Sequence, residues 1–127
     1  MPGQVALIGA GAFLPGMAAL DRDLLATIGR SRPRVAILPT ASAPDGEAVF
    51  RRWADMGVKH FAALGAEVEP VLVRTVEEGS DAAALQAIGE ADLVYLSGGK
   101  PAHLCAVLGG SPLGAAIRAA HARGAVI

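Results

Sequence analysis

Short apolar runs alternate with helical segments along the whole chain, and this alternation limits the folds open to it. Runs of strand character cover residues 4–9, 34–40, 67–74, 92–99 and 125–127. Helical spacing or helix-end signals mark residues 20–29, 47–64, 81–90, 101–110 and 112–123. Strands that are apolar on both faces predict a parallel sheet with helices on both sides. Right-handed crossovers make this one doubly wound α/β domain spanning residues 1–127.

The predicted helix ends carry recognisable boundary residues. Ser80 and Ser111 precede helical runs and are expected to cap them through their hydroxyl groups. Gly29, Gly65 and Gly124 follow helical runs and are expected to stop them. The run at 125–127 then reads as the beginning of a fifth buried strand.

Composition narrows the class of protein further. Hydrophobic residues make up 53% and charged residues 18%, which excludes a disordered chain. The net charge of −1 offers no basic excess for nucleic acid or anionic membranes. Cys105 is the single cysteine, so an internal disulfide is excluded and a reducing, cytoplasmic location is expected.

The uncharged first 20 residues predict neither a signal peptide nor a membrane span. No Lys or Arg precedes the apolar run, and four breakers interrupt it: Gly9, Gly11, Pro15 and Gly16. In a doubly wound sheet, ligands bind beyond the carboxyl ends of the strands. The candidate site therefore lies in the loops after Ile8, Leu38, Val73 and Leu96, together with whatever follows Ile127.

The stretch "GAGAFLPG" at 9–16 follows the first strand and invites comparison with a dinucleotide-binding loop. The third glycine of that pattern would be position 14, which is Leu14, and no acidic residue closes the second strand. We therefore interpret it as a glycine-lined turn, with Gly9 and Gly11 as candidate pocket-lining residues. No cofactor is expected.

The stretch "YLSGGKP" at 95–101 leaves two interpretations open. Gly98 and Gly99 directly after a buried strand let the backbone approach another group closely, and their N–H groups could hold an anion or a developing oxyanion. Lys100 is a further candidate pocket-lining residue. The alternative is an ordinary strand-to-helix turn.

The remaining reactive side chains favour structural roles. His60, His103 and His121 share no metal-ligand spacing and show no positioned partner, so neither a metal site nor a catalytic base is predicted. Cys105 lies among apolar neighbours and is expected to be a packed core residue.

Several stretches, taken in order, resemble the dipeptidase E and cyanophycinase family of serine peptidases. They are "LIGAGAFLPGMAALDRDLL", "VAILPTAS", "FAALGAEVEPVLV", "ADLVYLSGGKPAHLCAVLGGSPLGAAI" and "ARGAVI". They resemble more closely the relatives described as type 1 glutamine amidotransferase-like proteins. The resemblance is collinear over nearly the whole chain and implies a flavodoxin-like sheet of the class I glutamine amidotransferase type.

The same resemblance implies where the reactive groups lie. After a strand like "RGAVI" the family continues with a G-x-S-A-G turn that presents the nucleophilic serine, and the histidine and acid come later. This chain would then be the truncated N-terminal part of such a domain, with no catalytic residue before Ile127. By resemblance, Gly98 and Gly99 contribute to the oxyanion hole, and Gly9 and Gly11 belong to the glycine-rich loop.

Two departures from the family pattern bear on specificity. The glycine-rich loop of the family often carries Glu where this chain has Ala12 or Phe13. After the paired glycines, Lys100 and Pro101 stand where the peptidases have Asn or Asp and then Gln or Thr.

The expected function is therefore part of a serine-type hydrolase that acts on a small peptide or amide, and the chain alone is predicted to be inactive. A first alternative is a non-catalytic module that holds a small anion at "SGGKP" with Lys100. A second is a module that self-assembles through an exposed strand edge, and a homo-oligomer is expected.

Overall fold

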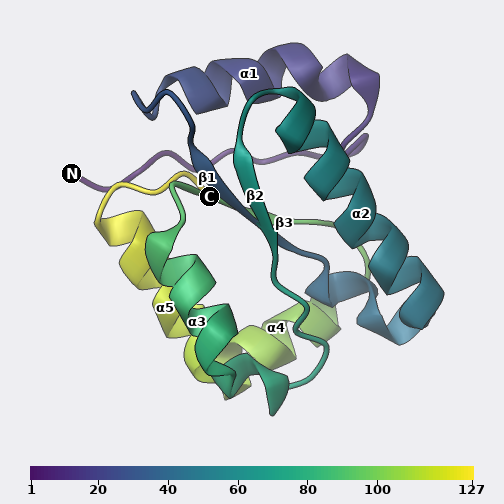
Figure 1. Ribbon diagram of the computed structural model, residues 1–127. Coiled ribbons are helices and arrows are strands. Elements are labelled where there is room, and N and C mark those ends of the chain that lie inside the picture. Colours follow the sequence, from purple (N-terminus) through teal and green to yellow (C-terminus); the bar gives the residue numbers. More distant parts are fainter.

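A computed structural model describes all 127 residues and shows a three-stranded parallel sheet between two helical layers (Figure 1). The strands are β1 (Arg34–Leu38), β2 (Glu67–Pro70) and β3 (Leu93–Leu96). The α-helices are α1 (Ala18–Ala26), α2 (Glu47–Ala63), α3 (Ala82–Glu90), α4 (Pro101–Gly110) and α5 (Pro112–Ala122). Three short 3₁₀ helices are η1 (Pro15–Met17), η2 (Thr40–Asp45) and η3 (Glu78–Ser80).

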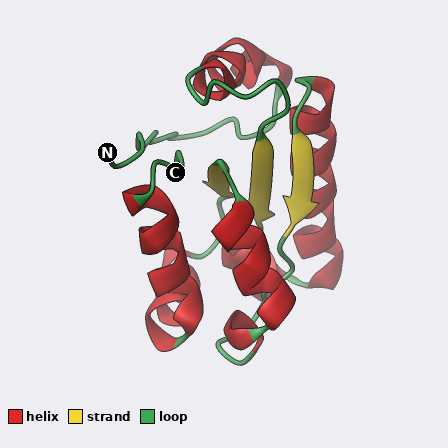
Figure 2. Cartoon of the chain, turned by 60° about the vertical axis from the view of Figure 1, so that its left-hand side comes forward, coloured by secondary structure: helices red, strands yellow, loops and turns green.

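The strand order is β2-β1-β3, so the central strand of the sheet is the first strand in the sequence. Val35 lies opposite Val68 on one side and Leu93 on the other. Figure 2 shows β1 and β2 side by side with their arrowheads at the same end. Val126 adds a parallel bridge to Leu93 beyond β3. The order β2-β1-β3 matches the start of the flavodoxin-like order 2-1-3-4-5, and the parallel sheet covered by helices on both faces confirms the predicted α/β fold class.

The first predicted strand is not a regular strand. Residues 4–6 run beside the chain end, where the Ala6 N–H donates to Ile127 O (2.8 Å) and the Ile127 N–H donates to Gln4 O (2.9 Å). Only Ile127 forms ladder-like hydrogen bonds with residues 4–6, and a single paired residue is too short to make a β-strand. The N-terminal segment therefore lies beside the chain end without forming a strand of the sheet, and the prediction of a strand at 4–9 is wrong.

The two faces of the sheet bury separate apolar cores. Ala36 and Leu38 of β1 pack with α3, α4 and α5, whereas Val35 and Ile37 pack with α1 and α2. Figure 1 shows α1 and α2 on the opposite side of the sheet from α3 and α5. The alternating side chains of a strand explain why one strand feeds both cores.

The helix boundaries follow local chemistry. Buried residues of α2 recur at Phe50, Ala54, Gly57 and Phe61, the spacing of one helix face. Ser111 caps α5 as predicted, since its hydroxyl accepts from the Leu113 N–H. The prediction for Ser80 is wrong: Asp81 caps α3, and its carboxylate accepts from the Ala84 N–H (3.0 Å). None of the helices combines the length and apolar composition needed to cross a bilayer.

Candidate functional site

The loop that follows β3 is held against η2 at the carboxyl edge of the sheet. The Ser97 N–H donates to Leu38 O (3.2 Å), and the Lys100 N–H donates to Ala41 O (2.7 Å). A Cβ atom built on Gly99 would collide with the carbonyl group of Ala41 and the Ser42 nitrogen. Glycine is therefore required at position 99 because two backbone segments touch there.

The paired glycines present two free backbone donors. Neither the Gly98 nor the Gly99 N–H donates to any acceptor of the chain, and both residues are exposed. Space around the Gly98 Cα is open, with no heavy atom within 4 Å of an added Cβ. Two neighbouring free N–H groups at the end of a buried strand have the chemistry of an anion or oxyanion site. The assignment of Gly98 and Gly99 to an oxyanion hole stays a prediction.

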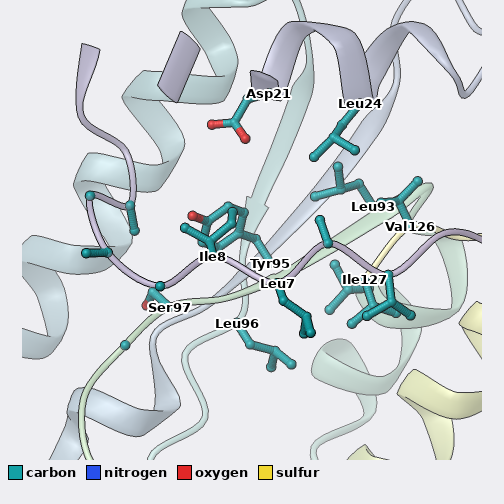
Figure 3. Close-up of a pocket in the computed structure, with 18 of the residues that line it drawn as sticks. Leu7, Ile8, Asp21, Leu24, Leu93, Tyr95, Leu96, Ser97, Val126 and Ile127 are labelled. Atoms are coloured by element: carbon teal, nitrogen blue, oxygen red, sulfur yellow. The ribbon is translucent and has the colours of Figure 1, made fainter. Parts of the chain in front are cut away.

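A cavity of about 770 Å³ lies beside these glycines, over β3 and the chain end (Figure 3). Its walls are residues 5–12 of the N-terminal segment, residues 93–98, Val126 and Ile127. Asp21 and Leu24 of α1 and Trp53 of α2 complete the lining. The cavity joins the two motifs singled out by the sequence, since the glycine loop at 9–12 and Gly98 face the same space.

Lys100 is placed differently from the other candidate residues. Neither Lys100 nor Gly99 lines the cavity. The Lys100 ammonium lies 3.9 Å from an Asp45 carboxylate oxygen, and its side chain is 63% exposed. The structure thus brings Gly9, Gly11 and Gly98 together and leaves Lys100 on the surface.

Buried polar residues of the cavity were not predicted from the sequence. Asp21 is fully buried, and its Oδ2 lies 2.7 Å from His60 Nε2 across the α1–α2 contact. Tyr95 projects from β3, and Ser97 follows two residues later on the same face. Two sequence features could have pointed to them. Asp21 is an acidic residue in a predicted amphipathic helix, and Tyr95 is the only tyrosine and lies in an otherwise apolar strand.

Tyr95 lies in an aromatic cluster that closes one wall of the cavity. Its ring centroid is 4.6 Å from that of Phe13 and 5.6 Å from that of Phe61. Burial, and then the nearby charge of Asp21, raise the pKa of the Tyr95 phenol to about 12. Phe13 adopts a φ of +63°, a conformation uncommon for a residue with a Cβ, and is itself buried. Packing of its ring therefore fixes the end of the glycine loop.

The three histidines each have a partner in the chain. His60 pairs with Asp21, whereas His103 Nε2 and His121 Nε2 contact the backbone carbonyl oxygens of Arg74 (2.7 Å) and Gly3 (2.8 Å). No group of three or more His, Cys, Asp or Glu residues is arranged to hold a metal ion. The expectation that Cys105 is buried is wrong, since it faces solvent from α4.

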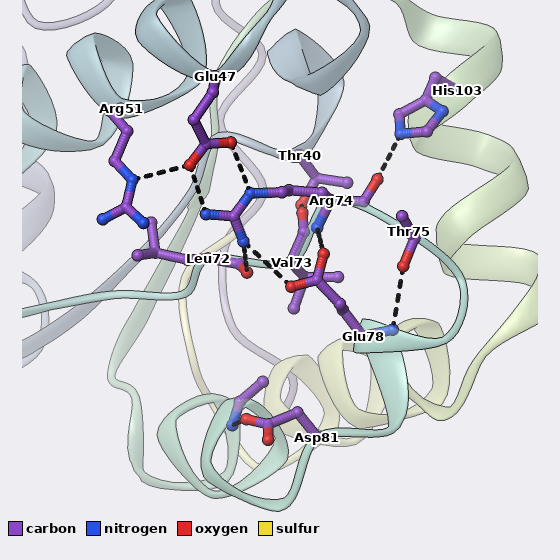
Figure 4. A network of polar contacts seen from close by, with 11 residues as sticks. Thr40, Glu47, Arg51, Leu72, Val73, Arg74, Thr75, Glu78, Asp81 and His103 are labelled. Atoms are coloured by element: carbon purple, nitrogen blue, oxygen red, sulfur yellow. Dashed lines mark hydrogen bonds and ion pairs between the residues drawn. The ribbon is translucent and has the colours of Figure 1, made fainter.

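A network centred on Arg74 fixes the loop after β2 at the same edge (Figure 4). The Arg74 guanidinium donates to both carboxylate oxygens of Glu47 (2.7 and 2.8 Å) and to Glu78, and it lies 4.6 Å from the centre of the Phe50 ring. Hydrogen bonds from Arg74 and then from Arg51 lower the pKa of the Glu47 carboxyl to about 2. The network joins the loop to the first turn of α2 and, through His103, to α4.

No serine in the chain has the surroundings of an activated nucleophile. The Ser42 and Ser111 hydroxyls donate to the carbonyl oxygens of Pro39 and Val107. Ser97 Oγ is buried without a hydrogen-bond partner, and no serine hydroxyl forms a hydrogen bond with a histidine. A base within hydrogen-bond reach is what activates such a hydroxyl.

A parallel sheet with free glycine amides and a cavity at its carboxyl edge defines a flavodoxin-like α/β domain. The family model of peptidase family S51 matches residues 5–127. The chain therefore belongs to peptidase family S51.

One solved peptidase structure agrees with this assignment, and a second shares the fold. A peptidase from an acI-B1 Actinobacterium matches with a TM-score of 0.92 and 26% identity, covering 99% of this chain and 52% of the other. A candidate peptidase E from Listeria monocytogenes EGD-e shares the fold, with a TM-score of 0.59, 20% identity, and coverage of 83% and 50%. The chain spans about half the length of these two proteins. No curated protein matches the sequence significantly.

The contact at Gly99 predicts different outcomes at the two paired glycines. Gly99→Ala forces a methyl group into the Ala41 backbone and should lower the free energy of unfolding by about 2 kcal/mol or more. Gly98→Ala meets open space and should change it by less than about 0.5 kcal/mol. Urea denaturation of both variants measures the difference, and equal destabilisation would contradict the placement of the loop.

The raised pKa of Tyr95 predicts late ionisation in the folded protein. Tyr95 is the single tyrosine, so tyrosinate absorbance near 295 nm reports on it alone. The folded chain should titrate near pH 12, and the chain unfolded in urea near pH 10. Between these values only the unfolded state releases the proton, so stability should fall as pH rises, by up to about 3 kcal/mol. Tyrosinate at pH 10 while far-ultraviolet circular dichroism stays native would contradict this.

Proposed function

We propose that this chain forms the N-terminal half of a serine-type hydrolase domain that acts on a small peptide or amide. The observation that carries the proposal is the pair of free N–H groups at Gly98 and Gly99, which lie beside the cavity at the carboxyl edge. Two comparisons support the same proposal: the chain belongs to peptidase family S51, and it matches about half the length of a solved peptidase structure.

In this proposal the reactive residues lie outside the 127 residues. A tetrahedral intermediate would place its oxyanion near the amides of Gly98 and Gly99, where fixed donors stabilise developing charge. The nucleophilic serine and its histidine would come from the chain that follows Ile127. The lack of any serine–histidine contact within the chain supports this division of roles.

The chain by itself is expected to be inactive, because a serine mechanism without its base loses the covalent step. An aspartyl dipeptide should show no turnover above a heat-denatured control, and a fluorophosphonate probe should label no serine. A full-length family S51 peptidase serves as the positive control for both measurements. Turnover by the 127 residues, or labelling of Ser97, would contradict the proposal. Coding sequence after Ile127 is expected to contain G-x-S-x-G and a later histidine.

The N-terminal edge supports self-association of the chain. Val5 and Leu7 are 58% and 92% exposed, and neither of their N–H groups donates a hydrogen bond. An open apolar edge is a template for pairing with a second copy, and we therefore propose a homo-oligomer.

Sedimentation velocity measures this association directly. Val5→Ser together with Leu7→Ser should shift the population toward monomer, because the pair carries the apolar part of the open edge. Leu20→Ser, which changes an exposed leucine of α1, is the matched control and should leave the distribution unchanged. A wild-type chain that sediments as a monomer would refute the proposed oligomer.

A further inference from the structure

The loops that follow the three strands are joined to one another by a closed ring of hydrogen bonds. The fully buried Thr40 hydroxyl, after β1, donates to Val73 O after β2 (2.8 Å). Figure 4 shows the His103 ring of α4 directed at the same loop, where Nε2 lies 2.7 Å from Arg74 O. The Lys100 N–H, after β3, donates to the backbone of η2 (2.7 Å) and closes the ring. Each loop is therefore tied to both of the others.

The acceptor at Arg74 is itself held in a fixed position. The Arg74 guanidinium donates to Glu47 (2.7 and 2.8 Å) and to Glu78 (3.0 Å), and the Arg74 N–H donates to Glu78 (3.3 Å). The guanidinium also lies over the Phe50 ring. Both the side chain and the backbone of Arg74 are therefore restrained, so its carbonyl group is a fixed point for any donor that reaches it.

His103 is the one residue through which α4 makes a polar side-chain contact with the rest of the chain. α4 has no charged residue, and Cys105 faces solvent. No other hydrogen bond joins α4 or the loop before it to the loop after β2. His103 is half-buried in the first turn of α4, four residues after Gly99. The free glycine amides and this hydrogen bond therefore lie on one short segment.

We propose that His103 is a positioning residue that holds the amides of Gly98 and Gly99 in place through its hydrogen bond to Arg74 O. A carbonyl oxygen only accepts, so the imidazole carries its proton on Nε2. An oxyanion site needs donors that are fixed before charge develops. The role of the amides rests on the proposed function, whereas the measurements below read only their rigidity, so the two can fail separately.

Two substitutions of His103 differ in the reach of the side chain. The amide nitrogen of Gln lies close to the place of Nε2, whereas that of Asn lies close to the place of Nδ1. His103→Gln should therefore keep the hydrogen bond, and His103→Asn should lose it. Nitrogen-15 relaxation measures the order parameters of the Gly98 and Gly99 amides. We expect about 0.85 in the wild-type chain and in His103→Gln, and below about 0.6 in His103→Asn.

His121 provides the matched control. It also contacts a backbone carbonyl oxygen through Nε2, that of Gly3 (2.8 Å), but from the last turn of α5. His121→Asn removes a bond of the same kind and should leave the order parameters of Gly98 and Gly99 at their wild-type values. An equal loss of rigidity at the two glycines in both Asn variants would indicate general loosening of the fold and would overturn the proposal.

The tautomer of His103 is a second test, and it needs no variant. At about pH 8, where an ordinary imidazole is neutral, long-range proton–nitrogen correlations should show the proton on Nε2. Protonation on Nδ1 would refute the hydrogen bond, and unchanged order parameters in folded His103→Asn would refute the positioning role. If circular dichroism shows that His103→Asn does not fold, the wild-type chain decides, because glycine order parameters below about 0.6 would show that nothing fixes these amides.

Discussion

The parallel pairing of β1 with both of its neighbours is the constraint on which the rest of the structure depends. β1 is the only strand with another strand on each side, and its residues from Val35 to Leu38 are almost completely buried. Its alternating side chains enter the two cores in turn, so both helical layers are positioned by the same four residues, Val35 to Leu38. A parallel strand in this position must be apolar on both faces. The location of the candidate site follows, because loops from β1 and β3 meet at the carboxyl edge.

That edge is built mainly from backbone contacts. The loop at 97–100 lies against η2 through the Lys100–Ala41 hydrogen bond and through the close approach at Gly99. The loop after β2 is fixed separately by the ion pairs of Arg74 with Glu47 and Glu78. The loop that carries the paired glycines is therefore held in place by backbone contacts with η2.

The cavity beside the glycines combines two kinds of surface. Its apolar lining comes mostly from β3, the chain end and the N-terminal segment, while Asp21, Tyr95 and Ser97 are buried polar residues among its lining. The Asp21–His60 pair lies in the α1–α2 contact and is buried, so it costs desolvation that only good geometry offsets. Such a pair fixes how α1 meets α2, and the second carboxylate oxygen of Asp21, Oδ1, is buried without a hydrogen-bond partner.

The sequence by itself determined the α/β class, three of the five predicted strands, the helices and the glycine motifs, because these depend on local periodicity and turn chemistry. The predicted strand at 125–127 is present only as a single bridge at Val126. It also indicated, through collinear motifs, the peptidase family to which the chain belongs. Only the tertiary structure decided that residues 4–9 lie at the edge of the sheet beside Ile127, that Cys105 faces solvent, and that Lys100 lies outside the cavity. It alone brought Asp21 to His60 and Tyr95, since these residues are 39 and 74 positions apart and no local pattern encodes a contact over that distance. Contacts between residues far apart in the sequence depend on how the helices pack on the sheet, and that packing depends on all the side chains of the core together.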